Sequence, residues 1–241
     1  MSDFSRGMDF ACRGIGEFFR RPKLWSFVVL PMLAVLAVYA GLSVLVLGIW
    51  LPEALTAVGD FFADGWLSFL RRPAEIGVKV FFYAGAAIFT AMTAGNLFEV
   101  LGSGAFAGMV RYYETEVLKC RVEPLSPLDR LRNLGATIVF SGGTWLLCLM
   151  FFLIGIVLPV VSPLLMIVFV GCRYAISYTS EAVFNSGRRL GETVGLFHGH
   201  RGLLYGFGAL AFLIFFVPVL PILLAPGLFI GGTLMYHHRR G

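Results

Sequence analysis

Charged residues are scarce in this sequence: only 14% of its 241 residues are Asp, Glu, Lys or Arg, whereas 58% are hydrophobic. A water-soluble domain of this size needs far more charge to cover its surface, so the composition excludes an ordinary soluble globular protein. The mean hydropathy of +0.84 points the same way. We therefore expect residues 1–241 to form one integral membrane domain, with almost every segment in or against lipid.

The sequence also lacks the motifs of common enzymes and cofactor-binding proteins. It has no glycine-rich nucleotide-binding loop, no HExxH zinc motif and no GxSxG nucleophile motif. Its four cysteines show no CxxC spacing, and neither pair of neighbouring histidines has a third metal ligand nearby. The 19 Lys and Arg residues lie scattered at the ends of apolar segments, a pattern that suits lipid headgroups and argues against nucleic acid. These absences predict a protein that is not an enzyme and holds no metal or cofactor.

Two apolar runs predict transmembrane helices. Residues 27–51 carry no charge, and Trp25 and Trp50 bracket them as interfacial anchors, which predicts a first transmembrane helix over 24–51. A second uncharged run begins at Val80 and continues, past one glutamate, through small residues, which predicts a second transmembrane helix over 79–110.

Two further apolar runs are too long for one crossing and contain prolines. Residues 133–172 and 202–236 are uncharged, and interior prolines break helices, so we expect two proline-broken, partly inserted (re-entrant) helical hairpins over 133–180 and 202–236. With hairpins, 16 of the 19 Lys and Arg residues fall on one side of the membrane, which places both termini in the cytoplasm. Complete two-pass hairpins would give the same sidedness, so the charges leave the depth of insertion open.

The start of the chain predicts an amphipathic interfacial helix over residues 1–23. Apolar residues recur there every three or four positions, and arginines recur every seven positions on another face. The apolar positions are Phe4, Met8, Ala11, Ile15 and Phe18. The fold class is thus an all-α integral membrane protein in which this helix lies on the cytoplasmic membrane surface.

The tripeptide Arg-Arg-Pro precedes each predicted transmembrane helix, once on each side of the membrane. Arginine pairs beside a helix N-terminus are candidate capture points for an oxyanion, and the alternative is that they reach lipid phosphates. The candidate residues are Arg20, Arg21, Arg71 and Arg72.

Inside the second span, two polar residues and a glycine pair stand out. Asn96 and Glu99 are the polar residues deepest in the apolar sequence and are candidates for lining a route through the protein. Gly104 and Gly108 form a GxxxG pair that predicts close helix packing.

The order of these features resembles the CysZ sulfate permeases and the wider etoposide-induced-protein family. The similarity lies in "RPKLWSFVVLP" at the first span, "AGNLF" and "GSGAFAG" around the second, "YTSEAVFN" between the hairpins, and "FGALAFLIFFVPVLPILLAPGLFIGGTLMY" near the end. The resemblance implies two transmembrane helices, two partly inserted hairpins and homo-oligomeric assembly in a bacterial inner membrane. It also implies permeation of sulfate for cysteine synthesis.

The family's anion loop differs in this chain, because Trp25 and Ser26 stand where the permeases have two arginines and Lys23 stands at a glycine. Our first hypothesis is a sulfate or oxyanion channel in which neighbouring charge replaces those arginines, with membrane lipids as further partners. The cytoplasmic site would comprise Arg20, Arg21, Lys23, Leu24 and Ser26, and Arg71 and Arg72 would act outside. The alternative is a non-transporting membrane scaffold that binds lipids or proteins through the amphipathic N-terminus and the basic loop 173–201, with Arg188 and Arg189 as the residues that test it.

Overall fold

The computed structural model describes residues 2–63, 68–120, 122, 127–158, 161–188, 190–214, 217 and 220–240, excluding the side chains of residues 87–100 and of scattered helical positions. Within these ranges the chain is helical and has no strand, which confirms the predicted all-α class. In chain order the α-helices are α1 (Asp3–Arg20), α2 (Pro22–Ser43), α3 (Leu51–Phe61), α4 (Arg71–Tyr112), α5 (Pro127–Val157), α6 (Val161–Asn185), α7 (Leu190–Leu196), α8 (Arg201–Ile214) and α9 (Leu220–Arg240).

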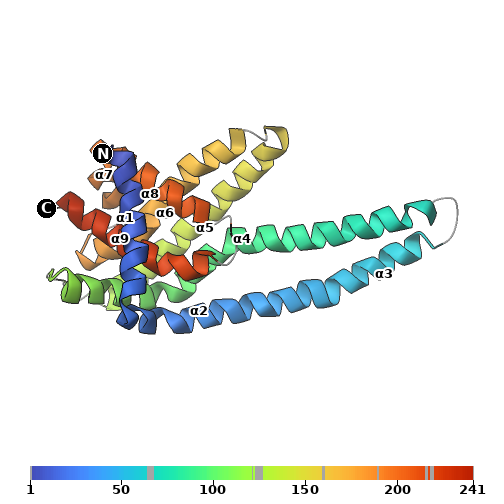
Figure 1. Cartoon of the computed structure of the whole chain (residues 1–241), viewed down its shortest axis with the longest axis horizontal. Coiled ribbons are helices and arrows are strands. Elements are labelled where there is room, and N and C mark those ends of the chain that lie inside the picture. The colour runs from blue at the N-terminus through green and yellow to red at the C-terminus, as the bar shows by residue number, and fades with distance from the viewer. Residues whose placement is uncertain are drawn as a thin grey trace.

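Helices α2, α3 and α4 form a long antiparallel arm that extends away from the other helices (Figure 1). α2 continues through a π-helical turn, Val44–Trp50, into α3, so that Pro22–Phe61 is one continuous helix of 40 residues. Its length is ~60 Å, about twice the hydrocarbon thickness of a bilayer. α4 returns beside it over 42 residues. The first long helix therefore continues beyond residue 51, where the sequence predicted that the transmembrane helix ends.

Only one stripe of α2 is buried. Its buried residues recur every three or four positions, as expected for one helical face, and α2 packs along α4. These residues are Leu24, Val28, Pro31, Val35 and Tyr39. The other faces of α2 expose large apolar side chains, among them Leu30 and Leu33. The arm therefore has a narrow protein interface and a wide apolar surface.

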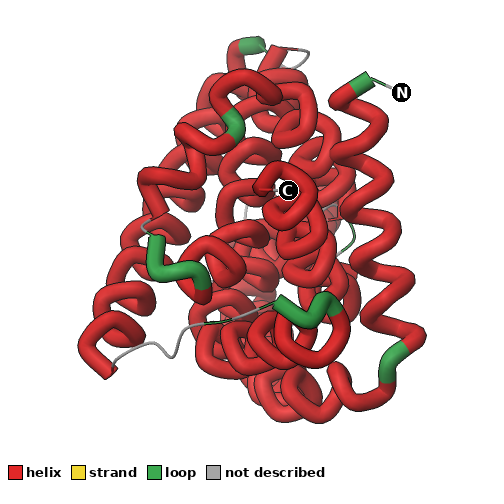
Figure 2. The backbone as a smooth tube through the Cα atoms, turned by 90° about the vertical axis from the view of Figure 1, so that its left-hand side faces the viewer, coloured by secondary structure: helices red, strands yellow, loops and turns green. Residues whose placement is uncertain are grey.

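The remaining helices gather at the base of the arm as a bundle, from which the tips of α5 and α6 project (Figures 1 and 2). α8 and α9 lie between α1 on one side and α6 on the other, and α5 packs against α6. Glycines let these helices touch backbone to backbone. A Cβ atom on Gly14 would overlap the backbone of Gly231, and a Cβ on Gly208 would overlap the backbone of Gly171. Bundle packing thus depends on the absence of side chains at the crossings.

The amphipathic helix predicted for residues 1–23 is present as α1, but its buried stripe is partly different. The buried residues are Gly7, Ala11, Gly14 and Phe18, and this face packs on α8 and α9. Phe4, which the pattern placed on the apolar face, is 45% exposed. A hydropathy pattern gives glycine little weight, whereas close helix crossings select it.

The apolar core of the bundle is aromatic. Phe106 of α4 stacks on Phe229 of α9 with ring centroids 4.5 Å apart, and the ring of Tyr178 meets Phe229 edge-on at 4.9 Å. All three side chains are at most 3% exposed. This cluster joins α4, α6 and α9 and so anchors the base of the arm to the bundle.

The membrane character follows from the helices themselves. Within the described residues, three helices are long and apolar enough to cross a bilayer: Pro22–Phe61, Ile138–Gly155 and Leu220–Arg239. Each of the two long apolar runs is broken once, between α5 and α6 and between α8 and α9. Pro163, Pro221 and Pro226 lie within α6 and α9, and Pro159 and Pro218 lie outside the described residues. A Cβ built at Gly104 meets no described atom within 4 Å, whereas one built at Gly108 meets the ring of Phe27, so close helix packing at this pair stays a prediction.

Candidate functional site

The first Arg-Arg-Pro motif lies at the junction of α1 and α2, at the base of the arm. Arg21 Nε donates to the Glu17 carboxylate at 2.8 Å, and its guanidinium lies 6.0 Å from the ring centre of Tyr113. The hydrogen bond to Glu17 raises the pKa of Arg21 above its ordinary value. Burial, reinforced by the Glu17 charge, raises the pKa of Tyr113 to about 12. Arg21 is therefore held in place by the protein.

Arg20 and Lys23, which flank Arg21, are exposed and form no ion pair with any described residue. Leu24 differs: its side chain is buried and its backbone N–H donates to the Arg21 carbonyl at 3.0 Å. The hydroxyl of Ser26 donates to the Lys23 carbonyl at 2.8 Å, which leaves its oxygen as an acceptor. Arg20 and Lys23 are thus the freest cations of the predicted cytoplasmic site.

Trp25, which the sequence resemblance places at an arginine position of the anion loop, packs against α1. Its ring stacks on Phe18 with centroids 5.4 Å apart and planes inclined by 8°, and its indole N–H donates to the Phe18 carbonyl at 3.3 Å. Phe18 is 1% exposed. The residue that replaces the arginine therefore fixes the angle between α1 and α2.

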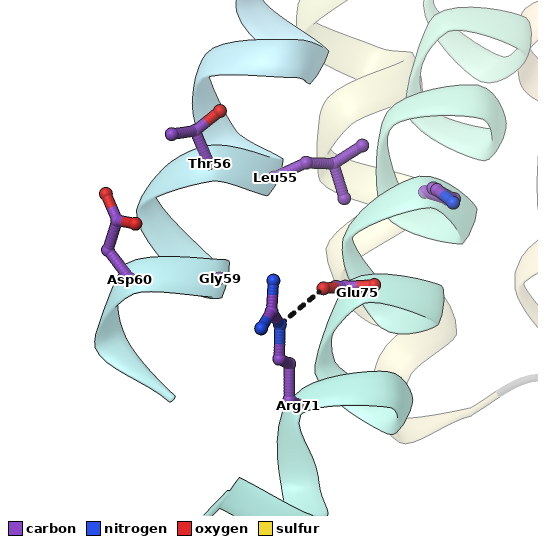
Figure 3. A pocket seen from close by; sticks show the side chains of 7 residues that line it. Leu55, Thr56, Gly59, Asp60, Arg71 and Glu75 are labelled. Atoms are coloured by element: carbon purple, nitrogen blue, oxygen red, sulfur yellow. Dashed lines mark hydrogen bonds and ion pairs between the residues drawn. The ribbon is translucent and has the colours of Figure 1, made fainter. Parts of the chain in front are cut away.

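The second Arg-Arg-Pro motif lies at the far tip of the arm, where α3 meets α4 (Figure 1). Arg71 Nε donates to Glu75 at 3.0 Å, and the guanidinium points toward Gly59 of α3, 3.2 Å from a Cβ built there (Figure 3). These residues border an open pocket of about 320 Å³ that Lys79 also lines. Arg72 is exposed. The two motifs lie at opposite ends of the arm and do not form one site.

Asn96 and Glu99, the predicted pathway residues, lie within α4. Their side chains fall outside the described residues. Their role in lining a route stays a prediction.

An arginine that the sequence analysis did not single out lies inside the α5–α6 hairpin. Arg173 of α6 donates from Nε to the Thr144 hydroxyl at 3.0 Å and from Nη2 to the Phe140 carbonyl at 2.5 Å. Its guanidinium also lies 4.1 Å from the ring centre of Phe140. It forms no ion pair with a carboxylate among the described residues. Arg173 is thus a half-buried cation held by neutral groups only.

The surroundings of Arg173 are polar on one face and otherwise apolar. Thr144 is 3% exposed, and Ser141, one turn earlier on the same buried face of α5, is 5% exposed. The Ser141 hydroxyl has no hydrogen-bond partner among the described residues. Gly143 allows the guanidinium to approach α5 closely, because a Cβ there would lie 2.7 Å from Nη2. The available signal was a charge directly after the uncharged run 133–172, which the sequence analysis assigned to the basic loop 173–201.

The comparison with known families agrees with this architecture. The family model described as sulfate transporter CysZ/etoposide-induced protein 2.4 matches residues 10–226. The match covers most of the chain, so the protein belongs to that family. No curated protein matches the chain in the corresponding search.

Proposed function

We propose that this protein lets sulfate, or a similar small oxyanion, cross a membrane. The membrane helices and the family support transport in general, and the observation that favours an anion is Arg173. Ionisable residues among apolar helices are costly and generally face a pathway or a partner. A half-buried arginine that meets only neutral groups in the described part of the chain is suited to an anionic partner.

The hydrogen-bonding capacity of Arg173 supports this assignment. A guanidinium has five N–H donors, and the described residues accept from only two of its atoms, Nε and Nη2. The atom Nη1 donates to no described residue. A tetrahedral oxyanion accepts planar, paired hydrogen bonds of the kind that these remaining N–H groups offer. The unpaired hydroxyl of Ser141 is a further donor on the same face of α5.

The remaining cations would act at the two ends of the route. Arg20, Arg21 and Lys23, with Ser26, would attract the anion at the cytoplasmic mouth, and Arg71 and Arg72 would do so outside. Packed hairpins or neighbouring subunits of a homo-oligomer would enclose the pore, with apolar constrictions as gates. In a bacterial inner membrane such a route would supply sulfate for cysteine synthesis.

The direct test is uptake of radiolabelled sulfate into proteoliposomes, with empty liposomes as the baseline. We expect saturable uptake in the wild type and at least about a tenfold loss with Arg173→Gln, because a desolvated charge partner is removed. Arg188→Gln is the matched control, since Arg188 is exposed beyond the end of α6. Equal loss in both variants, or no loss in Arg173→Gln, would contradict the role of Arg173.

A membrane scaffold remains the second candidate function. The observation in its favour is Trp25, which occupies an arginine position of the permeases and here serves the packing of α1. Correctly inserted protein that gives no flux above empty liposomes would support this candidate. It also predicts that changing Arg188 weakens binding to anionic lipid vesicles; its neighbour Arg189 lies outside the described residues.

A further inference from the structure

A buried polar cluster lies where the end of α4 meets α6 and α9. The Glu114 carboxylate lies 2.8 Å from His237 Nε2 through Oε1 and accepts from Asn185 Nδ2 through Oε2 at 2.7 Å. On the other side of the imidazole, Nδ1 lies 3.7 Å from the sulfur of Cys120. Glu114 and Cys120 lie in one short segment, whereas Asn185 and His237 come from distant parts of the chain, so the fold assembles the row Cys120, His237, Glu114 and Asn185.

With one imidazole tautomer the contacts of this row suit a proton transfer from the thiol to His237; the thiol also lies 3.7 Å from the Leu118 carbonyl oxygen, a second acceptor. An ionised carboxylate only accepts hydrogen bonds, and Glu114 accepts from the amide of Asn185 and from Nε2 of His237. With its hydrogen on Nε2, the neutral imidazole presents Nδ1 as an acceptor, and that atom faces the thiol of Cys120. This is the arrangement of a nucleophile, a base and an orienting carboxylate.

The burial of the cluster is graded from one end to the other. Glu114 is 1% exposed and Asn185 is 4% exposed, whereas the side chain of His237 is 22% exposed and Cys120 is half-buried. The carboxylate is thus shielded from water, and its hydrogen bond to the imidazole is stronger there than it would be at the surface. The thiol lies at the accessible end of the cluster.

The backbone is specially shaped to place Cys120. α4 ends in a π-helical turn, Tyr113–Val117, which contains Glu114, and Lys119 then adopts a positive φ of 55°. The N–H of Cys120 consequently turns back to donate to the Glu114 carbonyl at 2.8 Å. A non-glycine residue with positive φ costs free energy, and such residues and π-helical turns concentrate at functional sites.

We propose that Cys120 is a reactive thiol, activated by His237, whose substrate is a small hydroperoxide. His237 Nδ1 takes the thiol proton, and the resulting thiolate attacks one peroxide oxygen. The sulfur–oxygen bond forms as the oxygen–oxygen bond breaks, so the sulfur loses two electrons and becomes a sulfenic acid. The departing hydroxide, or the alkoxide of an organic hydroperoxide, takes the proton back from His237 and leaves as water or as the alcohol. Glu114 and Asn185 are positioning residues that hold the imidazole for both proton transfers.

The experiment uses the full-length protein in detergent micelles or liposomes, with hydrogen peroxide as the oxidant and dimedone to trap the sulfenic acid. Mass spectrometry follows the Cys120 peptide and the Cys12 peptide in the same sample. Cys12 is a demanding internal control, because it is exposed on α1, whereas Cys120 is half-buried. If accessibility alone governed the rate, Cys12 would react faster.

We expect Cys120 to react about tenfold or more faster than Cys12 near neutral pH, because base catalysis typically contributes at least that much. His237→Gln should reduce the rate at Cys120 to about that at Cys12 and leave Cys12 unchanged. Cys120→Ser should abolish the adduct on that peptide. A wild-type Cys120 that reacts no faster than Cys12 would overturn the proposal.

A second readout covers the case in which His237→Gln does not fold. Alkylation of the wild type by iodoacetamide, followed across pH, should show Cys120 reacting below the pH at which Cys12 begins to react. Coincident pH profiles for the two cysteines would overturn the proposal, since a purely structural contact between Cys120 and His237 predicts that outcome.

Discussion

The arm and the bundle each contain a long apolar helix, with mean hydropathies of 2.5 and 1.4 in their most apolar stretches, but bury these helices to different extents. In the most apolar stretch of each helix, 11% of the residues are buried in Pro22–Phe61 of the arm and 72% in Leu220–Arg239 of the bundle. Both helices are long and apolar enough to cross a bilayer. Composition therefore predicts that a helix is apolar. Whether the helix faces lipid or protein depends on its small residues and polar contacts.

Glycines mark this difference most clearly. Gly14 and Gly231 lie in backbone contact between α1 and α9, whereas Gly41 in the arm has no described atom within 4 Å of a built Cβ. Glycine is thus required for close packing in the bundle, whereas in the arm it only lowers the helix propensity.

The largest expected effect comes from replacing Gly14 and Gly41, one at a time, by alanine. Gly14→Ala places a methyl group in the backbone of Gly231 and should destabilise the protein by about 3 kcal/mol or more. Gly41→Ala should stabilise it by about 0.5–1 kcal/mol through helix propensity. Thermal unfolding in detergent, followed by circular dichroism, measures both. Shifts of the same sign would show that the bundle crossing is not as close as described.

A leucine pair within α2 tests where the arm enters the bundle. Leu24 is completely buried, whereas Leu33 is 58% exposed on the same helix. Leu24→Ala should cost about 2–4 kcal/mol by leaving a cavity. Leu33→Ala should cost less than about 0.5 kcal/mol in detergent, because Leu33 is mostly exposed and little protein contact is lost. A large cost for Leu33→Ala that depends on protein concentration would instead place a second copy of the chain against the arm.

Two glutamates make the same comparison for charge. Glu114 is buried beneath His237 and Asn185, whereas Glu75 pairs with Arg71 at the exposed tip of the arm. Glu114→Gln should destabilise the protein by about 2 kcal/mol. The carboxylate accepts one hydrogen bond through each oxygen, whereas the amide has an NH2 group in place of one oxygen, so a buried donor would lose its acceptor. Glu75→Gln should change the stability by less than about 0.5 kcal/mol. Urea unfolding measured for both variants in one detergent checks the difference.

Hydropathy and proline positions predicted the elements well, for a physical reason. Uncharged runs of sufficient length form helices in lipid, because each backbone polar group must be satisfied within the segment. Prolines in both long runs predicted a break in each, and breaks lie between α5 and α6 and between α8 and α9, although Pro163, Pro221 and Pro226 themselves lie within α6 and α9. The same analysis could not tell that α1 docks through glycines, since glycine contributes almost nothing to an amphipathic pattern.

The candidate sites were less accessible to sequence analysis. Arg173 ended an apolar run and was counted with a charged loop, although α6 continues through it to Asn185. Glu114 and His237 are separated by 123 residues, and no periodicity relates them, so only the fold brings them together. The Arg-Arg-Pro motifs were visible because their residues are adjacent in sequence, but adjacency did not reveal that Arg21 is paired and Arg20 is not.

That difference at the base of the arm gives the smallest expected effect. Arg21 and Glu17 are partly exposed, with side chains 42% and 26% accessible, so Arg21→Gln should cost less than about 1 kcal/mol of stability. Arg20→Gln should leave stability unchanged, because Arg20 forms no ion pair with a described residue.

For anion uptake the order should reverse. The charge of Arg21 is already balanced by Glu17, so Arg20→Gln should lower the initial uptake rate more, and more strongly at low ionic strength than at high. Uptake measured in parallel with unfolding would separate the two roles. A larger transport loss for Arg21→Gln would mean that the anion displaces Glu17 and binds at the paired arginine.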